Sequence, residues 1–445
     1  MTRLATPMER CGPGYLRDNS KNRAWSQRTK TKTPGGLTTR IATFPKASFG
    51  GETYSELKLN TDPWEDVIGL GFFGRHLVTF NFPRKTMHLG HRRAAPLASE
   101  PTNAPPATVG WWGGLPSADL DSESLAKRLL AAPNLHPGGE LPPAFWWSFH
   151  QPHLQPLRIA VGPPEARLSA RQLPPGKYPL QVVSKVTHKA SGQSELSLDY
   201  LHDKPGPVAP MEQRGTIFLL HGYNSQKESL TLWAYLLAEV GYRSILVDLR
   251  GHGESSGQSV SFGKYEIADL QEVLDTLINE RLCDGSVGAL GVGLGADLAL
   301  QWAARDSRVC AVVAIAPNRQ PELAFARTAQ DRKMSVKPEV LKGALDRAAT
   351  RLGINWPDWS SEAAVRQLKH PVLLIGGGKD DISTVEDLHL LEQAAPAGSK
   401  TLLIPNATRR EIPYWFHEIA QPVKSWFGAQ LRADIHSSPR HGASD

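Results

Sequence analysis

The sequence predicts an α/β protein with a mostly parallel sheet covered by helices on both faces. Short apolar runs typical of buried strands recur at 216–221, 244–248, 309–317 and 371–375. Helical patterns separate these runs, and strands that alternate with helices are typical of a parallel sheet. Because 445 residues exceed the usual size of one domain, we expect this large domain to be preceded by a smaller, β-rich segment.

A strand, a sharp turn and a helix are predicted in succession within residues 287–304. Val287 to Leu290 form the apolar run, Gly291 to Gly295 the turn, and Ala296 to Ala304 the helix. This is the layout of a nucleophile elbow, in which the pattern GxSxG exposes a serine hydroxyl on a strained turn. The middle position here is Gly293, which has no side chain with which to attack a carbonyl.

Three motifs in this order resemble those of the α/β-hydrolase family, in particular its esterase, lysophospholipase and serine-aminopeptidase-like branch. They are the pair His221-Gly222, the stretch DLRGHGES at 248–255 and the elbow itself. The resemblance covers residues 176–430. It implies the α/β-hydrolase fold and descent from serine hydrolases that act on carboxylesters, lipids or peptides.

The resemblance assigns roles to five positions. The oxyanion hole would be built from the backbone amides of Tyr223 and Leu294, which need no particular side chain. Asp380 stands where the acid of the triad is expected, with Asp381 as the fallback. The loop after the last strand contains no histidine, and Arg409 stands at the expected histidine position.

The catalytic triad is therefore degenerate. Arginine stays protonated and cannot act as a general base at neutral pH. We expect a pseudohydrolase that binds a small apolar acyl or ester-like ligand, or a partner, with no cofactor and no metal. The alternative is an active hydrolase with a displaced nucleophile or base, Ser225 or His417. The simpler interpretations are that Ser225 caps a helix beginning near Lys227 and that His417 lies at the start of the final helix.

A second motif overlaps the elbow. Residues Gly291 to Ala296 match GxGxx[GA], the dinucleotide-binding fingerprint. That fingerprint belongs to the first strand and turn of its sheet and expects an acidic residue at the end of the next strand, where this sequence has Ala316-Pro317-Asn318. Dinucleotide binding is therefore a remote alternative.

The amino-terminal part resembles the closing half of a retropepsin-like aspartic protease domain. Within residues 36–92, the turn Val67-Ile68-Gly69 precedes a phenylalanine-rich strand and a hairpin. No Asp-Thr-Gly or Asp-Ser-Gly occurs before residue 66, the nearest stretch being Asp18-Asn19-Ser20, so the catalytic aspartates are missing. Residues 1–35 hold eight Lys or Arg against two acidic residues and are expected to form a disordered basic tail.

The remaining boundaries follow from composition. Residues 93–175 contain 15 of the 35 prolines and are expected to form a connector with one amphipathic helix at 119–130 and two tryptophan-rich stretches. The hydrolase-like domain is expected at 176–432, with a lid at 318–369 and a disordered tail at 433–445. On the lid, Leu341, Leu345, Ala348 and Leu352 form one apolar stripe. Such a stripe is usually core packing, and on a lid it would also roof the pocket.

Cysteine content, hydropathy and the composition of the tail predict the compartment and partners. Cys11, Cys283 and Cys310 are too few for a disulfide framework, and the last two are predicted to be small core residues. No stretch reaches the roughly 18 apolar residues of a membrane span and no signal peptide opens the sequence, so a cytoplasmic protein is the default expectation. The basic tail lacks aromatic interleaving, and no nucleic-acid partner is expected.

Overall fold

The computed structural model describes residues 28–32, 38–49, 52–61, 66–68, 76–81, 86–91, 121–133, 153–178, 180–188, 194–202, 208–283, 287–332, 334 and 336–437. For 28–91, 180–202 and 432–437 this description is limited to the backbone. Asp18-Asn19-Ser20, Cys11 and the tryptophan-rich stretches at 111–112 and 145–149 lie outside these ranges. The chain divides into two units, residues 1–105 and 106–445.

The first unit contains only strands among its described residues. An antiparallel sheet has the order β1-β2-β3-β4, and a separate hairpin pairs β5 with β6. The strands are β1 (Arg28–Lys32), β2 (Thr38–Phe49), β3 (Glu52–Thr61), β4 (Asp66–Ile68), β5 (His76–Asn81) and β6 (Thr86–His91). The hairpin predicted at the end of this segment is present, and its likeness to a protease domain stays a prediction.

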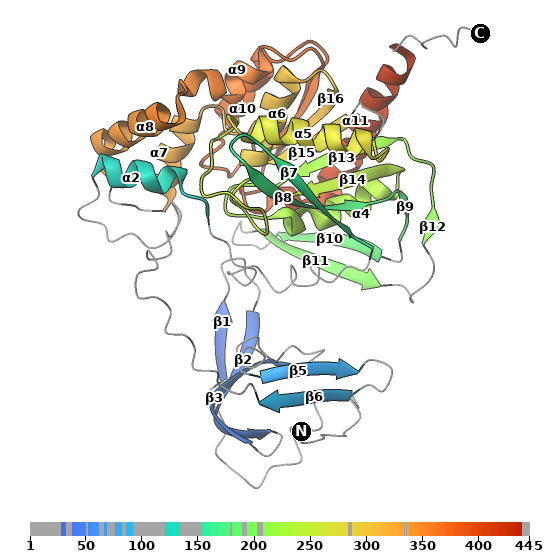
Figure 1. The fold of residues 1–445 in the computed structure, drawn as a ribbon, viewed down its shortest axis with the longest axis vertical. Helices are drawn as coiled ribbons and strands as arrows, with labels where there is room; N and C mark the ends of the chain where they lie inside the picture. The colour runs from blue at the N-terminus through green and yellow to red at the C-terminus, as the bar shows by residue number, and fades with distance from the viewer. Residues whose placement is uncertain are drawn as a thin grey trace. The chain divides into compact units, whose positions relative to one another are not determined.

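The second unit is built on an eight-stranded sheet (Figure 1). Its order is β18-β17-β16-β15-β13-β14-β8-β7, and all neighbours are parallel from β18 to β14, whereas β8 and β7 run antiparallel. The strands are β7 (Gln155–Val161), β8 (Ala166–Leu173), β13 (Gly215–Leu220), β14 (Tyr242–Val247), β15 (Val287–Val292), β16 (Val309–Ile315), β17 (Val372–Gly377) and β18 (Lys400–Ile404). Two short pairs accompany it, β9 (Gly176–Lys177) with β12 (Ala209–Pro210) and β10 (Leu180–His188) with β11 (Ser194–His202).

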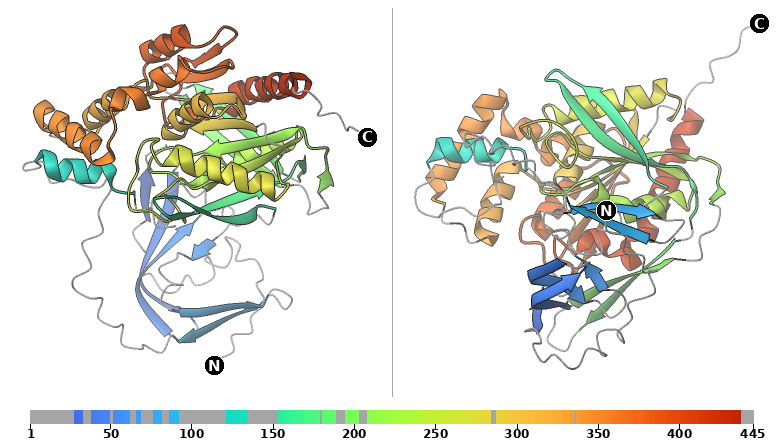
Figure 2. Two further views of the ribbon diagram at one scale, coloured as in Figure 1. Left: turned by 45° about the horizontal axis from the view of Figure 1, so that its top comes forward. Right: turned by 60° about the horizontal axis from the view of Figure 1, so that its bottom comes forward.

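Helices cover both faces of this sheet, as expected (Figures 1 and 2). Apolar residues of α5, α6 and α10 share one core cluster with the sheet, and those of α4 and α11 share the other. Strand β13 contributes alternately to the two clusters, with Phe218 and Leu220 in one and Ile217 and Leu219 in the other. The helical elements of the second unit are α2 (Ser122–Leu130), η3 (Lys227–Leu230), α4 (Thr231–Ala238), α5 (Glu266–Asn279), α6 (Leu294–Arg305), α7 (Pro321–Asp331), α8 (Pro338–Leu352), η4 (Trp356–Trp359), α9 (Ser361–Val365), α10 (Val385–Ala394), η5 (Ile412–Tyr414) and α11 (Phe416–Ser437).

The sheet begins upstream of the boundary expected at residue 176. Strands β7 and β8 lie within the segment expected to be a connector, and they form the edge of the main sheet. Proline does not prevent this, because Pro163 and Pro164 lie in the turn between the two strands and Pro156 lies on the edge strand, where a missing N–H is tolerated. The large unit therefore includes both this hairpin and α2, the amphipathic helix predicted near 119–130.

The apolar stripe of the lid forms core packing, as such stripes usually do, but it does not roof the pocket, because none of its four residues lines the cavity. Its four residues on α8 are all buried, and α8 packs against α2. The Ser122 hydroxyl donates to the Val340 carbonyl oxygen at 3.0 Å, and Arg351 pairs with Glu123. Sequence periodicity identified the buried face correctly but not the partner that covers it, because α2 lies far away in the sequence.

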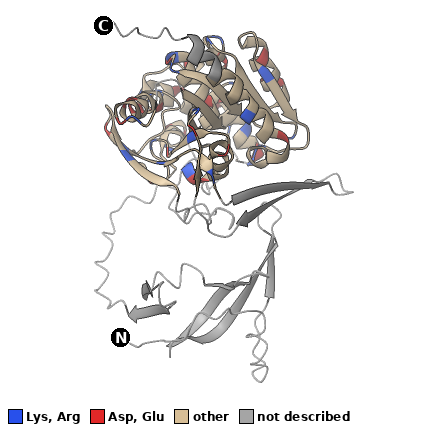
Figure 3. Ribbon diagram, turned by 90° about the vertical axis from the view of Figure 1, so that its right-hand side faces the viewer, with Lys and Arg blue, Asp and Glu red and all other residues tan. Residues whose placement is uncertain are grey.

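The cysteines and the charged residues of the second unit lie in different environments. Cys283 and Cys310 are buried, as predicted for small core residues. In the described part of the second unit, Lys and Arg are interspersed with Asp and Glu (Figure 3). Among the described residues, no helix is both long enough and apolar enough to cross a membrane.

Candidate active site

The turn between β15 and α6 has the geometry of a nucleophile elbow. Gly293 has φ 56° and ψ −117°, a conformation that residues with a side chain rarely adopt. The turn is tight because a Cβ on Gly295 would lie only 2.0 Å from the Leu220 carbonyl oxygen. The sharp turn predicted at Gly291 to Gly295 is confirmed. It lies at the carboxyl end of a central strand, which is where open α/β sheets bind ligands.

The loop after β13 lies beside this elbow. A Cβ placed on Gly293 would be 3.9 Å from the Gly222 Cα, so the backbone that follows His221-Gly222 borders the nucleophile position. Leu294 begins α6, and the first-turn N–H groups of a helix have no intrahelical acceptor. Tyr223 and Leu294, whose backbone amides the resemblance assigns to an oxyanion hole, thus line the same cavity.

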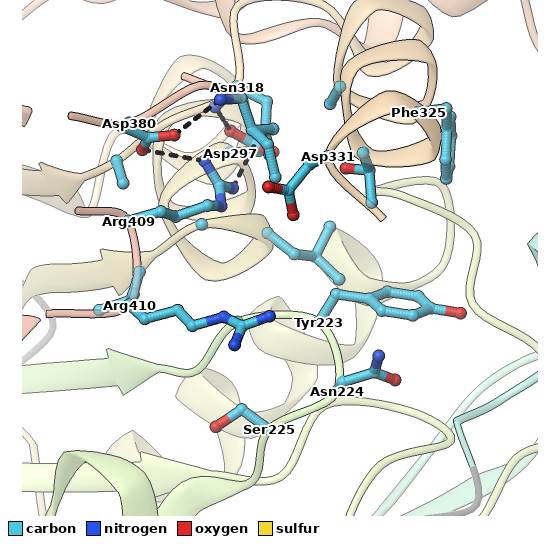
Figure 4. A pocket seen from close by; sticks show the side chains of 18 of the residues that line it. Tyr223, Asn224, Ser225, Asp297, Asn318, Phe325, Asp331, Asp380, Arg409 and Arg410 are labelled. Carbon is cyan, nitrogen blue, oxygen red and sulfur yellow. Dashed lines mark hydrogen bonds and ion pairs between the residues drawn. The ribbon is translucent and has the colours of Figure 1, made fainter. Parts of the chain in front are cut away.

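The guanidinium of Arg409 lies between Gly293 and Asp380. The Arg409 Nη2 atom would lie 3.2 Å from a Cβ on Gly293, and Arg409 Nη1 lies 3.4 Å from Asp380 Oδ2. Asp380 Oδ1 accepts hydrogen bonds from the backbone amides of Ile382 and Ser383. Burial raises the pKa of Asp380, and the positive charge of Arg409 opposes that shift. The structure therefore brings together the three triad positions proposed from the sequence, with glycine and arginine in two of them. Figure 4 shows Arg409 beside Asp380.

A second buried carboxyl group, that of Asp297, is linked to the Arg409 guanidinium through Asn318. It is not among the site residues predicted from the sequence. Asp297, on the first turn of α6, accepts hydrogen bonds from the backbone and side-chain amides of Asn318 and from the Ser361 hydroxyl. Arg409 Nη2 in turn donates to Asn318 Oδ1 at 2.8 Å. An aspartate in the otherwise apolar helix sequence LGADLALQWAA was the available signal.

Asp297 should make the stability of the protein depend on pH. Burial raises the pKa of Asp297 to about 7, so the native state retains a proton that the unfolded chain loses near pH 4. The unfolding free energy should therefore fall as pH rises from about 4 to about 7, by on the order of 4 kcal/mol from this group. In urea titrations across that range, Asp297→Asn should show a flatter profile than the wild type. The exposed control Asp346→Asn should not, and parallel profiles for wild type and Asp297→Asn would contradict this account.

These groups line a cavity of about 1090 Å³. Apolar side chains of Leu230, Phe262, Phe325, Met334 and Trp359 form part of its wall. In Figure 4, the Arg410 side chain lies between Arg409 and Ser225. The cavity therefore combines a polar end at the elbow with an apolar region toward α7, the helix that carries Phe325.

The alternative nucleophile and base are not brought together. Ser225 lines the cavity, whereas His417 lies at the start of α11, outside the lining residues, with its Nε2 atom 3.2 Å from Glu418. No histidine is among the described residues that line the cavity. Ser225 also does not cap the following helix: the cap residue of η3 is Gln226, and no side chain caps its first turn. The fallback acid Asp381 lines the cavity beside Asp380.

The loop that carries Tyr223 and Ser225 is anchored by a buried ion-pair cluster. The Lys227 ammonium, with 1% side-chain exposure, lies 2.5 Å from Asp248, 3.1 Å from Glu228 and 3.1 Å from Glu254. The Lys227 backbone amide also donates to Asp248 at 2.8 Å. The conspicuous stretch at 248–255 therefore positions the site through its carboxylates.

Comparison with known proteins agrees with this architecture. Residues 215–352 match a family model described as the alpha/beta hydrolase fold. An uncharacterized protein of Bacillus subtilis, YqkD, is 33% identical over 96 residues, which are 22% of this chain and 32% of that protein. The chain thus spans about a third of the length of this curated relative.

Solved structures with a similar arrangement include esterases. An esterase of Pyrococcus furiosus is 17% identical and aligns over 68% of this chain and 98% of its own, with a TM-score of 0.47. The Est1E protein of Butyrivibrio proteoclasticus, solved with ferulic acid bound, is also 17% identical and aligns over 62% and 99% of the two chains, with a TM-score of 0.44.

Proposed function

Because this chain belongs to the α/β-hydrolase fold family, we propose that it is a pseudohydrolase, which binds a small acyl or ester-like ligand in the cavity at Gly293 without cleaving it. The fold supplies the elbow and the backbone amides that border the cavity. The residues at the elbow do not supply a nucleophile and a base.

One observation supports this proposal above the others. The atom nearest to a Cβ on Gly293 is a guanidinium nitrogen, Arg409 Nη2. In a serine hydrolase this space holds a hydroxyl group in contact with a neutral imidazole that takes its proton. A permanently charged donor in the same space cannot accept that proton. The missing nucleophile at residue 293 and the missing base at residue 409 are therefore the two sides of one contact.

The alternative function is hydrolysis with Ser225 as a displaced nucleophile. Its support is that Ser225 lines the same cavity. Against it, no imidazole is among the described lining residues, and the acidic side chains in the lining are Asp297, Asp331, Asp380 and Asp381. Dinucleotide binding has less support still, since Gly291 and Gly295 are required by strand-to-helix packing: a Cβ on either would lie 2.0 Å from a backbone oxygen.

Ester turnover separates these functions. The purified protein should hydrolyse p-nitrophenyl acetate, butyrate and octanoate no faster than the same concentration of Ser225→Ala. Activity above the uncatalysed rate that disappears in Ser225→Ala would establish the alternative, and activity that survives in Ser225→Ala would contradict both functions.

A further inference from the structure

We propose that the ligand is a carboxylic acid with an apolar body, held with its carboxylate at Arg409 and the elbow amides. This inference rests on the proposed function and specifies its ligand class. A neutral ester would leave the guanidinium without an anionic partner from the ligand, whereas the corresponding free acid supplies one.

The donors of Arg409 carry the first step of the argument. A guanidinium has five N–H groups, and the described residues accept from two of its nitrogens, Nη1 toward Asp380 and Nη2 toward Asn318. The contact with Asp380 is long, at 3.4 Å. No acceptor among the described residues engages Nε–H or the second hydrogen on either terminal nitrogen. Arg409, with 24% side-chain exposure, therefore retains donors for a planar anion such as a carboxylate.

The backbone of the elbow adds donors at the same place. The Leu294 N–H begins α6, where the helix dipole favours negative charge. A Cβ on residue 293 would lie 3.2 Å from Arg409 Nη2 and 3.9 Å from the Gly222 Cα. The guanidinium and the backbone at Gly222 therefore both border the space beside Gly293. An anion at Gly293 would thus contact a guanidinium and a helix amide together. The missing side chain of Gly293 leaves room for a ligand oxygen.

The rest of the cavity specifies the body of the ligand. Phe262, Phe325 and Trp359 line it, and the rings of Phe262 and Phe325 pack edge to face with centroids 5.2 Å apart. These surfaces favour an alkyl or aryl group. Arg332 and Arg410 also line the cavity, together with Asp331 and Asp381. Burial and the charge of Arg410 lower the pKa of Arg332, whereas the charge of Asp331 raises it. The contact with Arg409 and the elbow amides, rather than the summed charge of the lining, therefore carries the carboxylate assignment.

Matched ligands test this assignment by isothermal titration calorimetry. Octanoate and octanamide have the same apolar chain and differ in charge at the head group, and octyl phosphate tests whether any anion suffices. We expect octanoate to bind at least about 10-fold more tightly than octanamide, as for loss of one charge-assisted contact. Arg409→Gln should reduce octanoate affinity about 10-fold and leave octanamide affinity unchanged, while Arg409→Lys, which keeps the charge, should lose less.

Controls keep the outcomes distinct. Arg366→Gln removes an exposed guanidinium outside the cavity and should bind octanoate like the wild type. Equal affinity for octanoate and octanamide, no binding of octanoate, or a preference for octyl phosphate would each overturn the carboxylate assignment. Equal binding of the two octyl ligands would still leave a pocket that binds without cleaving. Conversely, tight octanoate binding combined with ester turnover would overturn the proposed function while supporting the carboxylate contact.

Discussion

The double variant Gly293→Ser/Arg409→His should hydrolyse p-nitrophenyl butyrate about 100-fold faster than Gly293→Ser alone. Serine by itself introduces a hydroxyl group with no base to remove its proton. The Cβ of that serine would lie 3.2 Å from the guanidinium nitrogen Arg409 Nη2. Histidine at 409 removes that contact and places an imidazole beside Asp380, which already accepts two backbone amides. The gain should be non-additive, because nucleophile and base act as one unit.

The single variants are the controls for this experiment. Arg409→His alone has a base but no nucleophile, and it should stay at the wild-type rate. Gly293→Ser also places a side chain at φ 56°, which costs about 1–2 kcal/mol of stability, so thermal unfolding must be measured for all three variants. A Gly293→Ser rate equal to that of the double variant would mean that another group, such as His417, already serves as the base.

Lys227→Met should lower the unfolding free energy by about 3–5 kcal/mol. The ammonium group is buried among the carboxylates of Asp248, Glu228 and Glu254, and its removal leaves negative charge without that partner. Methionine has a side chain of similar length to lysine. The loss of unfolding free energy therefore reflects the missing positive charge more than a change in side-chain volume. Urea unfolding at neutral pH measures the change.

The matched control is Lys342→Met on α8. This lysine is 79% exposed and pairs with Asp346 one helical turn away, so its loss should change the unfolding free energy by less than about 0.5 kcal/mol. Equal effects of the two substitutions would show that the buried cluster does not stabilise the loop before α4. A large loss confined to Lys227→Met, accompanied by weaker octanoate binding, would connect the cluster to the shape of the site.

The parallel strands and the elbow could be predicted from the sequence because each depends on local pattern. Buried parallel strands appear as uninterrupted apolar runs, and Gly293 lies at the centre of a recognisable turn. Boundaries were less accurate: β15 extends to Val292 rather than Leu290, and α6 begins at Leu294 rather than Ala296. Helix and strand ends depend on individual hydrogen bonds that periodicity does not specify.

What the sequence could not predict depends on contacts between distant segments. The hairpin β7–β8 was hidden because prolines in its turn and on its edge strand made the segment resemble a connector. The α8 stripe packs on α2, roughly 200 residues earlier, and no local pattern indicates that partner. In the site, the resemblance located Arg409 and Asp380. The network from Arg409 through Asn318 to Asp297 joins the ends of two strands and a helix turn, so only the fold reveals it.

The most direct test of the central claim, that residues 293 and 409 no longer form a nucleophile and base, is reaction with a fluorophosphonate followed by intact-mass analysis. Fluorophosphonates phosphonylate serines that are activated by a base, irrespective of which ester the enzyme prefers. The wild-type protein should remain at its unmodified mass after exposure that fully labels an active serine hydrolase, whereas Gly293→Ser/Arg409→His should gain one adduct on Ser at 293. A stoichiometric adduct on any serine of the wild-type protein, Ser225 above all, would contradict the claim.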